Sequence, residues 1–147
     1  MTPCRIPKPP WTSWLATAAL ALAVAATAAA GSLGEESELR SGETVSYDEG
    51  ALSLTFEGVS RDNRCPKGVQ CIVAGEAVVE LTAEAGGAHA TLTFKVPGRD
   101  PSQDFGGYTI TVTAVDPQTR PGRQIAPEDY VVRLVVERSA SSEAGGA

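Results

Sequence analysis

Two cysteines and three basic residues lie close together in the middle of this chain and are its best candidates for chemistry. Cys65 and Cys71 are separated by five residues that include a Pro-Lys-Gly turn, and the basic neighbours are Arg61, Arg64 and Lys67. In an oxidising compartment this spacing predicts a disulfide. So short a bridge would hold one loop in shape and would contribute roughly 2 kcal/mol by chain-entropy arithmetic.

Metal binding and thiol redox catalysis are the alternative chemistries for the two cysteines. Zinc sites are built from paired Cys or His ligands, and downstream of the N-terminal segment only His89 could join Cys65 and Cys71. A redox pair would have two residues between the cysteines, not five. We therefore predict a disulfide, no metal and no cofactor.

The three basic residues allow two interpretations. Arg61, Arg64 and Lys67 could form a docking surface for an anionic partner or an acidic polymer, presented on a rigid loop. They could equally belong to a solvated turn in which Asp62 pairs with a neighbour, a contact that contributes little to stability. The sequence leaves both interpretations open.

The same stretch carries a resemblance. The run from Ser60 to Ala77 contains RCP, GVQC and AGEA in that order, and RDNRCPKGVQCIVAGEA resembles a motif close to DSRCP–GVQCVWAGEA in a family of uncharacterised secreted bacterial domains. The likeness covers roughly residues 43–137, but its specific part is these 18 residues. Asn63 and Val73 stand where the family tends to have serine and tryptophan. The resemblance implies a β-fold and an extracytoplasmic location, and it carries over no catalytic residue.

The N-terminal segment predicts export. Residues 1–30 read as a secretory signal peptide, because Arg5 and Lys8 precede an apolar run that ends in small residues suited to an A-x-A cleavage site. An uncleaved N-terminal membrane anchor is the alternative, since the run approaches the ~20 residues that a span needs. Either way the rest of the chain is expected outside the cytoplasm: secreted, periplasmic or at the cell surface. After cleavage no membrane insertion is expected.

The chain beyond the leader is acidic. It holds all 18 acids but only ten of the 12 Lys and Arg residues, which leaves a net charge of −8. Nucleic-acid binding needs a basic face, so this balance argues against a nucleic-acid partner. The same balance argues against electrostatic docking on anionic lipid.

Alternation of apolar and polar residues predicts an all-β fold. Strands are expected at residues 43–47, 51–60, 76–84, 88–96, 108–115 and 129–137, and Gly86-Gly87 marks a tight turn. Alternation in 108–115 directs Ala114 inward. These six or seven short strands predict a single antiparallel β-sandwich, Ig-like or small barrel-like, over residues 43–137. Residues 31–42 are expected to form a flexible acidic linker, and residues 138–147 a disordered tail.

Catalysis is not expected, because nucleophilic chemistry needs a base that titrates near neutral pH. His89 is placed on the outward face of its strand. We therefore predict a non-catalytic binding or accessory module that uses Arg61, Arg64 and Lys67 on the disulfide-stapled loop. Its expected partner is an envelope or extracellular protein. A small carboxylate- or metal-dependent hydrolase and a structural envelope protein without a discrete ligand are the alternatives.

Overall fold

The computed structural model describes residue 3, residues 29–98 and residues 101–140. Most of the predicted signal peptide and residues 141–147 of the predicted tail therefore lie outside the described residues. Within the described part the chain forms nine β-strands and two short 3-10 turns. No helix among these residues is long and apolar enough to cross a bilayer.

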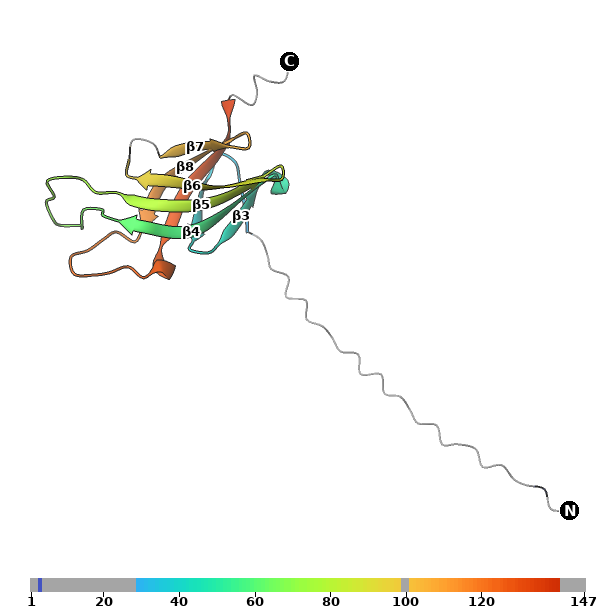
Figure 1. Ribbon diagram of the computed structural model, residues 1–147, viewed down its shortest axis with the longest axis horizontal. Helices are drawn as coiled ribbons and strands as arrows, with labels where there is room; N and C mark the ends of the chain where they lie inside the picture. The colour runs from blue at the N-terminus through green and yellow to red at the C-terminus, as the bar shows by residue number, and fades with distance from the viewer. Residues whose placement is uncertain (1–2, 4–28, 99–100, 141–147) are drawn as a thin grey trace.

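The nine strands form two sheets that pack face to face (Figure 1). The first sheet has the order β1 (Ala29–Gly31), β3 (Thr44–Tyr47), β4 (Leu52–Asp62), β5 (Ala77–Ala85) and β6 (Ala88–Val96). The second has the order β2 (Glu36–Arg40), β9 (Val131–Arg138), β8 (Tyr108–Asp116) and β7 (Ser102–Phe105). The strand pairs are antiparallel except for β1 and β3, which are parallel. The predicted all-β sandwich is confirmed.

The core lies between the two sheets and follows the period-two pattern of the sequence. Alternate residues of β4 are fully buried at Leu52, Leu54 and Phe56. In β5, alternate residues from Ala77 to Ala83 are fully buried as well. The buried apolar residues of the described chain all lie between Leu39 and Val136. A chain that begins at residue 29 therefore contains the whole described core.

The predicted flexible linker at residues 31–42 is wrong, because β2 is part of the second sheet. β2 pairs antiparallel with β9, where Leu39 lies opposite Val132 and is fully buried. Gly31 belongs to β1 and packs on the ring of Tyr47 so closely that a Cβ would lie 2.2 Å from a ring carbon. The sandwich thus extends from residue 29 to residue 138, beyond the predicted 43–137.

Three further predictions need correction. Residues 97–107, to which no strand was assigned, contain the short strand β7, which pairs with β8. The predicted tail begins too early, because Arg138 is the last residue of β9 and Ser139 is buried. In β8 a register shift between Val112 and Ala114 directs Val115 into the core, so Ala114 is only half-buried.

Two connections leave the sandwich at the same end, the left side of Figure 1. Residues 63–76 join β4 to β5 and are called here the stapled loop. Residues 117–126 follow β8 and lead to the 3-10 turn η2 (Pro127–Asp129); they are called the support loop. Together they make the loop end of the molecule. The β5–β6 turn and the 3-10 turn η1 (Asp48–Gly50) lie at the opposite end.

Candidate functional site

The stapled loop contains the predicted disulfide. Cys65 and Cys71 are bonded, with their Cα atoms 6.0 Å apart. The bridge closes a small ring at the loop end, so the backbone between the two cysteines has few conformations open to it. This prediction is confirmed.

The stapled loop also carries an apolar tip that sequence reasoning missed. Val69 is 45% exposed, Ile72 105% and Val73 77%, and these are the exposed large hydrophobic residues of the described chain. One signal was available in the sequence. Beyond the end of β4, apolar residues follow one another and no longer alternate with polar residues. Val73 faces solvent, so a larger side chain at this position would also project outward.

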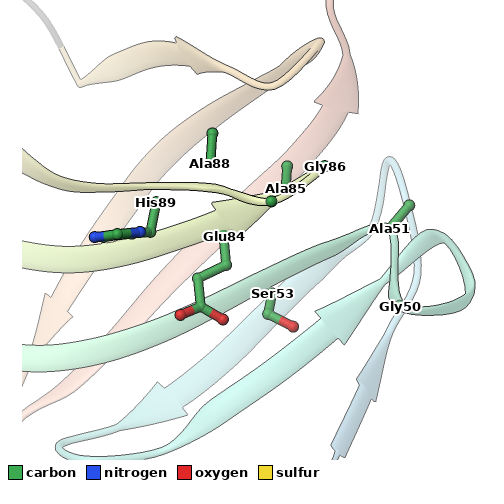
Figure 2. A pocket seen from close by; sticks show the side chains of 9 residues that line it. Gly50, Ala51, Ser53, Glu84, Ala85, Gly86, Ala88 and His89 are labelled. Carbon is green, nitrogen blue, oxygen red and sulfur yellow. The ribbon is translucent and has the colours of Figure 1, made fainter.

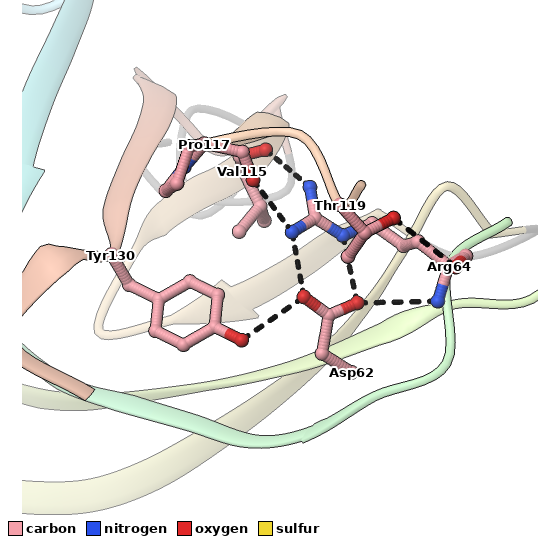
Figure 3. A network of polar contacts seen from close by, with 6 residues as sticks. All are labelled: Asp62, Arg64, Val115, Pro117, Thr119 and Tyr130. Atoms are coloured by element: carbon pink, nitrogen blue, oxygen red, sulfur yellow. Dashed lines mark hydrogen bonds and ion pairs between the residues drawn. The ribbon is translucent and has the colours of Figure 1, made fainter. Parts of the chain in front are cut away.

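Arg64, predicted as a binding residue, is a structural residue instead. Its Nε donates to Oδ1 of Asp62 at 2.9 Å and its Nη2 to Oδ2 at 2.6 Å, which makes a two-pronged ion pair. The same guanidinium donates to the carbonyl oxygens of Val115 at 2.5 Å and Pro117 at 2.9 Å. Tyr130 adds a hydrogen bond from its hydroxyl to Asp62 Oδ2 at 3.0 Å (Figure 3). The Arg64 and Asp62 side chains are only 11% and 9% exposed, so neither is free to bind a partner.

The electrostatics of this cluster follow from its geometry. Burial raises the pKa of Asp62, but the hydrogen bonds and positive charge of Arg64 outweigh burial and hold that pKa below its ordinary value. Burial and the hydrogen bond to Asp62 raise the pKa of the Tyr130 hydroxyl. Asp62 is therefore charged and Tyr130 neutral at physiological pH. The cluster works as a fixed tie between the end of β4 and the end of β8.

Backbone contacts complete the base of the stapled loop. The amide of Asn63 donates to the carbonyl of Glu76 at 2.9 Å, which closes the loop where β5 begins. Gly75 lies so close to this point that a Cβ would fall 1.5 Å from the carbonyl oxygen of Asn63. The amide of Lys67 donates to the carbonyl of Thr119 at 2.9 Å, which joins the stapled loop to the support loop.

The other two predicted binding residues do not form one cluster with Arg64. Arg61 is 60% exposed and lies 4.0 Å from a carboxylate oxygen of Glu76, which Lys95 also approaches at 3.6 Å. Lys67 is exposed and lines a hollow of about 550 Å³, together with Arg120 and Arg123 of the support loop and with Asp116 and Asp129. Sequence reasoning missed both arginines, because they are distant from the cysteines along the chain.

A second hollow, of about 340 Å³, lies at the opposite end of the sandwich (Figure 2). Ser53, Glu84 and His89 lie side by side there on β4, β5 and β6, in the order in which the strands pair. No hydrogen bond joins the three side chains in the described structure. His89 is exposed, as expected, and Glu84 separates it from Ser53. A nucleophile needs its base within hydrogen-bond reach, so this row does not form a nucleophile–base pair.

Metal ligands do not gather in the described part of the chain. Among residues 29–98 and 101–140, no group of three or more His, Cys, Asp or Glu side chains could hold an ion. The two cysteines are joined to each other, which removes their thiolates as ligands.

Comparison of the chain with protein-family models, with curated proteins and with solved structures found no match. The loop end is therefore the candidate functional site on the evidence of its own geometry.

Proposed function

We propose that this protein is a non-catalytic, extracytoplasmic binding or accessory module that docks on another component of the envelope or the extracellular medium through its stapled loop. One observation carries the proposal: the exposed large hydrophobic residues of the described chain, Val69, Ile72 and Val73, all lie on this loop. Exposed apolar side chains gathered at one place are typical of interaction surfaces.

The tip is also held in place before any partner arrives. The disulfide, the Asp62–Arg64 ion pair and the contact between Lys67 and Thr119 fix the loop at separate points. A surface ordered in advance loses little conformational entropy when it binds, and this improves affinity. The loop therefore suits docking better than a mobile loop of the same composition would.

A photo-crosslinking experiment tests the proposal. A photoreactive amino acid at Gln70, exposed within the stapled loop, is expected to give a specific adduct with envelope material, whereas the same group at exposed His89 is not. The double variant Ile72→Ser, Val73→Ser should lose the Gln70 adduct while it keeps the fold, because both side chains are exposed. Equal labelling from the two positions, or labelling that survives the double variant, would favour a structural envelope protein without a discrete ligand.

A further inference from the structure

The loop end has a charge opposite to that of the rest of the protein. The stapled loop and the support loop, residues 63–76 and 117–126, contain four basic residues and one acid, Glu76, in a chain whose net charge beyond the leader is −8. Arg64 is neutralised by Asp62. The other three, Lys67, Arg120 and Arg123, make no ion pair within the described residues.

The three cations lie on the stapled loop, which carries the apolar tip, and on the support loop that is hydrogen-bonded to it. Lys67 is part of the ring closed by the disulfide, and its amide bonds to the residue that precedes Arg120 in the support loop. Lys67, Arg120 and Arg123 line the same hollow of about 550 Å³. The loop end thus carries both protruding aliphatic side chains and positive charge that makes no ion pair within the described residues.

We infer that the loop end docks on a bilayer surface that carries anionic phospholipids. Val69, Ile72 and Val73 enter the interface, and Lys67, Arg120 and Arg123 contact the headgroup phosphates. This inference rests on the proposed role of the stapled loop as the docking element. It agrees with the general rule that one weak apolar anchor needs a basic patch beside it to hold a protein at a membrane.

Charge and shape favour lipid over a protein partner. A protein partner would need a pocket that admits the protruding tip and acidic residues matched to cations on two loops. An anionic bilayer admits the tip and supplies negative charge all around it, whatever the rotation of the protein about the tip. The net charge of −8 argues against attraction of the chain as a whole to anionic lipid, so the inference concerns the loop end alone. Salt screens charges beyond a Debye length of about 8 Å, so acids at the far end of the sandwich scarcely affect the contact. Among the described residues, the acids within or next to the two loops are Asp62, Glu76 and Asp116, which are paired with Arg64, Lys95 and Arg133, and Glu128 and Asp129 of η2.

Vesicle co-sedimentation tests the inference. The chain from residue 29 onward is used, because it holds the whole described core and lacks the apolar leader, which would bind lipid itself. Vesicles of equimolar phosphatidylglycerol and phosphatidylcholine are expected to bind it, and vesicles of phosphatidylcholine alone to bind it far less. Binding should weaken as salt is added. A thermal melt of each variant serves as the control that the variant is folded.

The variants separate the two parts of the surface. Ile72→Ser with Val73→Ser should lower binding about tenfold or more. Lys67→Gln or Arg120→Gln should each lower binding about fivefold. Asp129→Asn, which removes an acid at the same end, should raise binding, and His89→Ser at the opposite end should leave it unchanged.

Two results would overturn the inference: no binding to anionic vesicles by the folded protein, or binding that is unchanged by the substitutions at Ile72, Val73, Lys67 and Arg120. Suppose the protein does not bind anionic vesicles, but the Gln70 adduct forms with a protein and still depends on the tip. The partner is then a protein, and the proposed function stands. If both fail, the stapled loop is not a docking element.

Discussion

The guanidinium of Arg64 encloses the carboxylate of Asp62, with Nε–Oδ1 at 2.9 Å and Nη2–Oδ2 at 2.6 Å. The two residues are neighbours in the chain, but the same guanidinium also bonds to the carbonyls of Val115 and Pro117 at the end of β8. One side chain therefore connects the stapled loop to the second sheet. Residues beyond this tie can stay exposed and still be held in one place.

Removal of Arg64 should destabilise the fold strongly. Arg64→Ala would leave the charged Asp62 side chain, which is only 9% exposed, without its partner. We expect the free energy of unfolding to fall by about 3 kcal/mol. Arg64→Lys should recover little, because an ammonium cannot reproduce the two-pronged geometry. Unfolding in urea measures the free energy of unfolding of both variants. Arg61→Ala, at a 60% exposed site, is the matched control and should change stability by less than about 0.5 kcal/mol.

Acid should weaken the fold through Asp62. Its pKa in the folded state lies below the ordinary 3.8, so the folded state binds the Asp62 proton more weakly than the unfolded state does. The stability that Asp62 contributes is complete above about pH 4 and is lost as pH falls through the folded pKa.

The test compares the free energy of unfolding of the natural protein with that of Asp62→Asn between neutral and acid pH. The variant cannot titrate at this position, so it should be less stable at neutral pH and should lose less stability on acidification. An identical acid dependence in the two proteins would contradict the assignment.

Two glycines of the stapled loop should respond differently to alanine. At Gly75 a Cβ would fall 1.5 Å from the Asn63 carbonyl oxygen, so Gly75→Ala must push the base of the loop apart, at an expected cost of about 2 kcal/mol or more. Gly68 has a φ of +85° and no atom within 4 Å of an added Cβ. Gly68→Ala should therefore cost only about 1 kcal/mol of backbone strain. Thermal unfolding ranks the pair, and a larger effect at Gly68 would contradict this account of the loop base.

β2 should prove essential to the sandwich. Leu39→Ala removes a fully buried side chain from the core and should cost about 2–5 kcal/mol. If residues 31–42 were a flexible linker, the same change would have almost no effect. Glu38→Ala, on the exposed face of β2 and paired with Arg133 at 3.1 Å, serves as the control and should cost less than about 1 kcal/mol. Chemical denaturation distinguishes the two outcomes.

Local pattern predicted most of the first sheet. β3, β4, β5 and β6 alternate apolar and polar residues, and the Gly86-Gly87 turn joins β5 to β6 as a tight turn, as expected. β2 and β7 were not predicted, because each is a short edge strand with little apolar surface. In β2 only Leu39 is buried. β2 is stabilised by pairing with β9, far away in the chain, and no local signal records that pairing. β7 pairs with the adjacent β8 across the Gly106-Gly107 turn, so its pairing is local and only its apolar pattern was too weak to predict a strand.

The sequence by itself determined the all-β class, the Cys65–Cys71 disulfide and the exposed position of His89, because period-two alternation and a short cysteine spacing act over a few residues. Only the tertiary structure decided what the basic residues do. It buried Arg64 against Asp62 and two distant carbonyls, and it brought Arg120 and Arg123 beside Lys67. It also left Ile72 and Val73 in solvent. Each of these results depends on how β8 and the support loop pack against the stapled loop, which is a long-range contact.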